Sequence, residues 1–437
     1  MNKTLKIILG VVGSLIVFSA ILIVIPRTRE AITWRANDLM VSIRSWLNPP
    51  ESVNVGIGSQ KTHDLQATLL AMQPTNTPVN TLAPTRLQNT ATPAVTNTPL
   101  PTPHPTAFKL EGVKYFTQKG FFNYCAPANL AMAMSYWGWA GKIEDVGNGV
   151  KPNPVDKNVM PYELANYARD VVGLGAVERV GGSPELIKRF ISAGYPVLVE
   201  KGVILTDIHN KKSWMGHYQV VTGFDDNKGV FIAQDSYLRP NLEEPYDVFL
   251  KDWRSFNYTY IILYKPEKEA EVMAMLGPDA DETANFRNAF ALASNEVNGL
   301  TGSDQFFAWY NIGTNLVKLQ DFGGAADAYD QAYAIYDTLP KELESRPYRI
   351  LWYQTGPYFA YYYMGRYQDV VNLATNNSIN MVLDDQPALE ESFYWRGMAR
   401  HELGEVQGGI DDMNKAIEYH AGFPPAVQAL QTWGVNP

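Results

Sequence analysis

Cysteine is nearly absent from this sequence, whose 437 residues contain a single one, Cys125. A lone thiol forms no intramolecular disulfide, and without other thiols it is poorly suited to form a metal site. Cys125 is therefore either a small buried hydrophobic residue or a nucleophile. The lack of cysteine pairs leaves the redox compartment open, because many exported bacterial proteins also have none.

Positive charge is also scarce. Lys and Arg number 36 against 45 Asp and Glu, which gives a net charge of -9, so the chain offers no basic stripe to neutralise phosphates. We therefore expect no nucleic-acid partner. With 46% hydrophobic and 19% charged residues, the composition suits packed globular domains, and the length predicts two or more of them.

Charged residues are missing altogether from Ile7 to Ile25, an apolar run broken only by Gly and Ser. The run approaches the roughly 20 residues that cross a bilayer core, and no convincing small-x-small cleavage site follows it. We predict that residues 1–27 are an uncleaved N-terminal membrane anchor, rather than a signal peptide or a buried core helix. Residues 28–72 are then a juxtamembrane segment, with either an interfacial amphipathic helix or one without a special role.

Hydrophobic residues are few in residues 73–107, which are rich in Pro, Thr and Asn. Such a tract buries too little apolar surface to fold, and its prolines favour an extended chain, so it predicts a disordered, semi-rigid stalk. Stalks of this composition are typical of surface proteins. We therefore expect a single-pass membrane protein whose globular part is extracytoplasmic.

Residues 108–266 carry the mixed pattern of an α+β domain. Helices are predicted where small and apolar residues follow a capping residue or a first-turn proline, and strands where apolar residues alternate or cluster between turn residues. The predicted helices are 126–139, 161–168 and 183–190; the predicted strands are 113–116, 196–200, 217–224, 230–235 and 258–264. Residues 225–229 form the turn of a hairpin between the third and fourth strands.

Residues 280–437 are helical and repetitive. Three related units are centred on Ala325, Val370 and Gly409, and the second is degenerate because Pro357 falls in its first helix. The units resemble the tetratricopeptide repeat, whose small residues allow two helices to pack closely. The region is either a helical spacer or a surface for a protein partner, and the concave shape of such arrays favours the partner.

The position of Cys125 favours a nucleophile. It begins an apolar, helix-like run, and the positive end of a helix dipole favours the thiolate form. A base is also needed. Of the six histidines, His63 and His104 precede the folded part, His401 and His420 lie in the repeats, and His209 lies in a polar loop. His217, at the start of a predicted strand behind Gly216, remains as the base.

The predicted hairpin places Asp235 beside His217, because opposed Cβ atoms of neighbouring strands lie about 5 Å apart. Asp235 can therefore hold the imidazole in one tautomer, and Gln118, upstream of the cysteine, can donate its amide to an oxyanion. Each residue also has an ordinary structural interpretation: Cys125 as packing, His217 as a core histidine and Asp235 as a strand cap. The ordered set of all four favours chemistry.

The segments Gln118…Cys125-Ala-Pro-Ala-Asn-Leu and Gly216-His217-Tyr-Gln-Val-Val-Thr-Gly…Gln-Asp235-Ser resemble the papain-like cysteine peptidases related to the double-glycine leader peptidases of bacteriocin exporters. The resemblance implies a papain-like fold in which Cys125 is the nucleophile, His217 the general base, Asp235 its orienting group and Gln118 part of the oxyanion hole. Ala126 departs from the glycine that often follows the cysteine in that family.

The resemblance implies a peptidase that acts on a peptide or protein substrate without a cofactor. No transporter domain or ATPase follows in this sequence, so we expect a stand-alone member of the wider family. Two alternatives stay open: an inactive papain-like module that binds peptides on a tetratricopeptide scaffold, and an acyl transferase that passes the acyl group to an amine.

Overall fold

The structure is a computed structural model that describes residues 104–206, 212–382 and 386–437. The predicted anchor at 1–27, the juxtamembrane segment at 28–72 and the stalk up to residue 103 lie outside these ranges, as do His63 and His209. Within the described ranges, every helix is too short or too polar to span a membrane.

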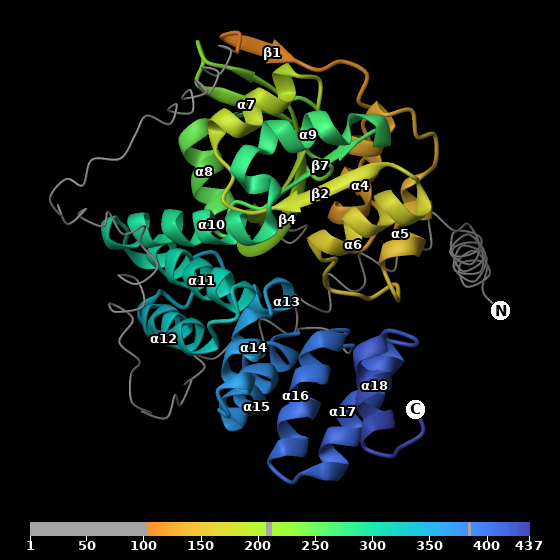
Figure 1. The fold of residues 1–437 in the computed structure, drawn as a ribbon, viewed down its shortest axis with the longest axis vertical. Coiled ribbons are helices and arrows are strands. Elements are labelled where there is room, and N and C mark those ends of the chain that lie inside the picture. The colour runs from red at the N-terminus through yellow and green to blue at the C-terminus, as the bar shows by residue number, and fades with distance from the viewer. Residues whose placement is uncertain (1–103, 207–211, 383–385) are drawn as a thin grey trace, which may run out of the picture.

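An antiparallel sheet organises the first half of the described chain (Figure 1). Its strands follow the order β2-β7-β3-β4-β5-β6, and β1 pairs with β4 beside this path. Sequence neighbours β3, β4 and β5 therefore lie side by side, as a hairpin pattern predicts. The strands are β1 (Ala107–Lys109), β2 (Gly175–Arg179), β3 (Val197–Thr206), β4 (Lys212–Asp225), β5 (Val230–Gln234), β6 (Leu242–Pro245) and β7 (Tyr260–Tyr264).

Helices cover both faces of this sheet (Figure 1). One face, which includes Leu198, packs against α4 (Cys125–Tyr136), α5 (Ile143–Val150) and α6 (Pro161–Asn166). The other face, which includes Val197 and Val199, packs against α7 (Pro184–Ser192), α8 (Tyr246–Arg254) and α9 (Glu269–Leu276). Alternate residues of β3 thus enter different cores, because successive side chains of a strand point to opposite faces.

The predicted elements of this domain are largely present. The helix expected at 183–190 is α7, whose cap is Ser183: its Oγ accepts a hydrogen bond from the Leu186 N–H at 3.2 Å. The strand predicted at 113–116 is wrong, since these residues form no strand. The Lys114 N–H donates instead to Ser135 Oγ at 2.9 Å, which ties the backbone of this segment to α4.

Helices make up the second half of the chain, as predicted. They follow one another as stacked pairs below the sheet domain (Figure 1). They are α10 (Glu282–Glu296), α11 (Gly302–Lys318), α12 (Phe322–Thr338), α13 (Ile350–Tyr353), α14 (Gly356–Tyr363), α15 (Tyr367–Asn376), α16 (Glu390–Glu402), α17 (Val406–Tyr419) and α18 (Pro424–Thr432). We call residues 282–432 the helical region.

The pairs α11–α12, α14–α15 and α16–α17 fall where the three sequence units were predicted. Small residues allow the last pair to approach closely: a Cβ at Gly409 would lie 2.9 Å from the carbonyl oxygen of Gly397. Pro357 lies in the first turn of α14, where a helix tolerates proline, so the second pair still forms with a short first helix.

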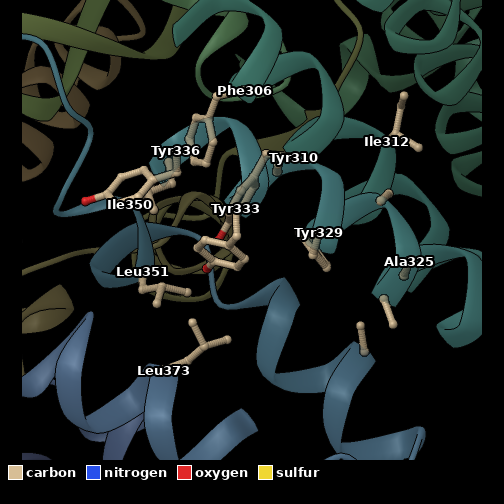
Figure 2. Close-up of a cluster of buried hydrophobic side chains, with 14 of the residues drawn as sticks. Phe306, Tyr310, Ile312, Ala325, Tyr329, Tyr333, Tyr336, Ile350, Leu351 and Leu373 are labelled. Carbon is tan, nitrogen blue, oxygen red and sulfur yellow. The ribbon is translucent and has the colours of Figure 1, made fainter. Parts of the chain in front are cut away.

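An aromatic core holds the helical region together, and it extends into the sheet domain. Figure 2 shows part of it, where Phe306, Tyr310, Tyr333 and Tyr336 crowd between the helices. Trp214, from β4, belongs to the same buried cluster. The sheet domain and the helical region therefore share a core instead of being joined by a free linker.

Candidate active site

Cys125 is the first residue of α4, as the sequence predicts within one residue. The residues that follow it in the helix, from Ala126 to Ser135, are buried, whereas the cysteine itself is partly exposed. No acidic residue occurs in the first turn. The positive end of the helix dipole at Cys125 is therefore not offset by a carboxylate on the helix itself.

The β4–β5 hairpin carries the other two predicted residues. Gln234, the last residue of β5, pairs with Val220 of β4. Asp235 follows Gln234 directly and therefore lies diagonally from His217 on β4. His217 Nε2 donates to Asp235 Oδ2 at 3.0 Å, and both side chains are buried. The Gln219 amide donates to the same Oδ2 at 2.6 Å. The strand predicted to begin at His217 begins earlier, at Lys212, so His217 lies within a strand and not at its end.

The second carboxylate oxygen of Asp235 is held by the backbone. The N–H groups of Tyr237 and Leu238 each donate to Oδ1 at 2.8 Å. Both oxygens of the carboxylate are therefore occupied, and its plane is fixed. A fixed carboxylate in turn fixes which nitrogen of His217 carries the proton toward it.

Burial and charge set the protonation of this pair. Burial alone would lower the pKa of His217, but the Asp235 carboxylate and the contact with Cys125 outweigh it and raise the pKa to about 10. Burial likewise tends to raise the pKa of Asp235, yet His217 and the amide of Gln219 hold that pKa below its usual range. The imidazole is thus protonated and the carboxylate ionised at neutral pH.

The Cys125 side chain lies close enough to His217 to help raise the pKa of the imidazole. Because Nε2 is engaged by Asp235, Nδ1 is the ring nitrogen left to interact with sulfur. One imidazole therefore links the partly exposed sulfur to the buried carboxylate. This is the arrangement that a nucleophile, a base and an orienting group require.

Gln118 reaches the same site. Its N–H donates to the Ser236 carbonyl at 3.0 Å, and its Oε1 accepts from Ser236 Oγ at 2.6 Å. Because the oxygen of the amide is held by Ser236, the NH₂ group is the end available to a ligand. Asn129 completes the support: its Nδ2 donates to Ser236 Oγ at 2.9 Å and to the Cys125 carbonyl at 2.8 Å.

A buried cation lies beside the nucleophile. Lys151 Nζ donates to the Phe122 carbonyl at 2.8 Å and lies 5.0 Å from the centre of the Tyr124 ring. Burial lowers the pKa of Lys151 to about 8, opposed by nearby negative charge that includes Cys125. The lysine remains mostly charged at pH 7, and a cation in this position favours a thiolate.

A buried carboxyl group also lies near Cys125. Burial raises the pKa of Glu200 well above its ordinary value, and the negative charge of Cys125 adds to the effect. Burial thus favours the neutral form of Glu200, which does not repel a thiolate.

The structure thus brings together all four residues selected from the sequence, and keeps three other histidines away from them. His104 lies against Phe224, His401 stacks on Trp433, and His420 Nδ1 lies 3.0 Å from Glu390 Oε1. In the described part of the chain, no group of His, Cys, Asp or Glu side chains is placed to hold a metal ion.

Sequence reasoning missed four supporting side chains: Gln219, Asn129, Ser236 and Lys151. Two of them had a usable signal. Gln219 is two residues beyond His217 on a strand, which places it on the same face, and Asn129 is one helical turn beyond Cys125. Lys151 reaches the site by its tertiary position alone.

Part of this chain is similar to known proteins. Residues 110–261 match the model of the Peptidase_C39 like family. A crystal structure described as that of a C39-like peptidase from Bacillus anthracis is similar at 18% sequence identity, covering 36% of this chain and 98% of that one, with a TM-score of 0.31. No curated protein matches the sequence.

Proposed function

Because residues 110–261 form a domain of the C39-like peptidase family, we propose that this chain hydrolyses peptide bonds with Cys125 as nucleophile, His217 as general base and Asp235 as orienting group. One observation carries the proposal. A single buried imidazole lies near the only thiol of the chain and is hydrogen-bonded to a fixed carboxylate. Packing alone does not require that coincidence.

The first half-reaction forms an acyl-enzyme. The Cys125 thiolate attacks the carbonyl carbon of the scissile peptide bond, and the carbonyl oxygen takes the negative charge. As the C–N bond breaks, protonated His217 gives its Nδ1 proton to the leaving amine. Asp235 stabilises the imidazolium before this step and holds the ring in place throughout.

The developing oxyanion needs hydrogen-bond donors. The N-terminus of α4 provides backbone N–H groups that have no partner within the helix. The Gln118 amide, whose oxygen is held by Ser236, is the second donor. Donors fixed in advance in this way are worth roughly 10²–10³ in kcat for each one.

The second half-reaction releases the acid. Neutral His217 takes a proton from water, the hydroxide attacks the acyl carbon, and the Cys125 thiolate leaves as the product carboxylate forms. An amine that takes the place of water gives an amide, which would make the protein an acyl transferase. A site that binds peptides without either reaction is the third outcome, and product analysis separates the three.

The other parts of the chain complete the proposal. The apolar run at 7–25 and the Pro/Thr-rich tract that follows support a single-pass anchor with the globular part outside the cytoplasm. The three helix pairs and their small residues support tetratricopeptide-like repeats that bind a protein partner or present substrate. Cleavage of the stalk by protease added to intact cells tests the topology; protection of the stalk contradicts it.

The chemistry is tested by alkylation of the full chain with iodoacetamide. Wild-type Cys125 should react faster than a cysteine-containing peptide at pH 6, where a free thiol is almost wholly protonated. His217→Gln should remove that advantage, while His401→Gln, a histidine stacked on Trp433, should keep it. A wild-type rate equal to that of the peptide, unchanged in His217→Gln, refutes the proposal.

A further inference from the structure

The helical region contributes a side chain at the edge of the candidate active site. Tyr353, the last residue of α13, packs on the backbone of β4 at the residue before His217. A Cβ at Gly216 would lie 3.1 Å from Cε1 and Cζ of Tyr353, and 2.8 Å from Phe256 Cζ. Two aromatic rings therefore fill the space beside Gly216.

Tyr353 is held firmly in this place. The next residue, Gln354, donates from Nε2 to the Ser255 carbonyl in the sheet domain at 2.6 Å, and its own carbonyl accepts from Tyr310 Oη at 2.6 Å. On the other side, Trp352 Nε1 donates to the Ser378 carbonyl at 3.2 Å. The short helix α13 is therefore anchored to both the sheet domain and the helical region.

The strand before His217 is held by the same surface. The Trp214 N–H donates to the Leu343 carbonyl at 2.9 Å, so the backbone of β4 is bonded directly to the segment between α12 and α13. The Trp214 ring lies between Phe256 and Phe307, whose ring centres are 6.0 and 5.8 Å away. It also meets the Tyr353 ring edge-on at 6.3 Å. The helical region thus fixes β4 through side chain and backbone just before the base.

Tyr353 is also within electrostatic reach of Cys125. Burial raises the pKa of Tyr353, so its hydroxyl stays neutral at working pH. The ring therefore adds no charge that competes with the thiolate for the imidazolium.

We propose that Tyr353 is a positioning residue for His217, through which the helical region sets the distance between the imidazole and Cys125. The inference rests on the proposed thiol chemistry. Without the ring, a gap opens beside Gly216, where the backbone has no side chain of its own to fill it. The strand then relaxes toward the gap, and the His217 ring moves with it, away from sulfur and Asp235.

The test compares three variants of the full chain. Tyr353→Ala removes the ring, Tyr353→Phe keeps the ring without the hydroxyl, and Tyr358→Ala removes another buried tyrosine, whose hydroxyl bonds with Ser392 inside the helical region. Both alanine variants should lower the melting temperature, because each leaves a cavity. The pH profile of iodoacetamide alkylation at Cys125 then separates positioning from general destabilisation.

We expect Tyr353→Ala to lower the alkylation rate at pH 6 at least tenfold, and Tyr358→Ala to leave it within twofold of wild type. Tyr353→Phe should restore most of the rate. Equal losses in the two alanine variants, or no loss in Tyr353→Ala, overturn the positioning role. A wild-type chain without enhanced reactivity overturns the proposed function and this inference together, so the two failures are distinguishable.

Discussion

The contribution of Asp235 to the proposed chemistry has a magnitude that follows from the structure. Its carboxylate and the contact with Cys125 raise the pKa of His217 from 6.5 to about 10 despite burial. At 1.36 kcal/mol per pKa unit, this corresponds to about 5 kcal/mol of preference for the imidazolium. Asp235→Asn removes the charge, so burial then dominates and the imidazole becomes neutral near pH 7.

A neutral His217 offers no positive charge to stabilise the thiolate that the proposal requires. A free thiol ionises near pH 8.5, so at pH 6 only about 0.3% of it is thiolate. We expect Asp235→Asn to lower the rate of iodoacetamide alkylation at pH 6 by roughly 10- to 100-fold, and to change the rate little at pH 9. The measurement is the alkylation rate of the full chain between pH 5 and pH 9.

Stability must be followed in the same experiment. Asparagine has one carbonyl oxygen, whereas both oxygens of Asp235 accept hydrogen bonds: Oδ2 from His217 and Gln219, Oδ1 from Tyr237 and Leu238. The variant should therefore melt at a lower temperature, and rates must be taken below that transition. Asp247→Asn, at an exposed position on α8, is the matched control and should match wild type. A folded Asp235→Asn chain with the wild-type pH profile refutes the reasoning.

Three further predictions concern other side chains. Lys151→Met should lower Cys125 alkylation at pH 7 by roughly two- to tenfold, because a buried cation beside the thiolate is lost; an unchanged rate in the folded variant contradicts this. Gln118→Ala should lower kcat on any cleaved peptide by roughly 10²–10³ yet leave alkylation unchanged, since alkylation builds no oxyanion; equal losses in both assays point to a structural role. Burial and Glu390 raise the pKa of Glu163 to about 7. Its contribution to the free energy of unfolding is thus present below pH 4.5 and lost as pH rises through 7, by up to about 3 kcal/mol. The free energy of unfolding, measured by urea denaturation, should fall less between pH 5 and pH 8 in Glu163→Gln than in wild type. An equal fall in both proteins contradicts the assignment.

Much of the candidate site could be predicted from the sequence because its parts are local. Cys125 is the only thiol of the chain, and His217 and Asp235 are joined by a short hairpin whose turn residues are recognisable. Their approach needs no knowledge of the rest of the fold. The helix pairs were predicted for the same reason, since the spacing of small residues repeats along the sequence.

The rest of the site depends on distant parts of the chain coming together, and sequence patterns do not encode that. Lys151 reaches the nucleophile from the end of α5, and Tyr353 reaches Gly216 from the helical region. The strand predicted at 113–116 failed for a related reason. Its apolar pattern suits a strand, but a hydrogen bond from Lys114 to α4 takes the place of a sheet partner.

The most direct test of the proposed chemistry is peptide hydrolysis in H₂¹⁸O. The full chain is incubated with a mixed peptide library, and the products are identified by mass spectrometry. The proposal predicts new carboxyl termini that contain ¹⁸O in the wild type and none in Cys125→Ala, because water must attack the acyl carbon. Products joined to an added amine without ¹⁸O would show acyl transfer instead. A wild-type chain that yields no more products than Cys125→Ala would contradict the claim that this site cleaves peptide bonds.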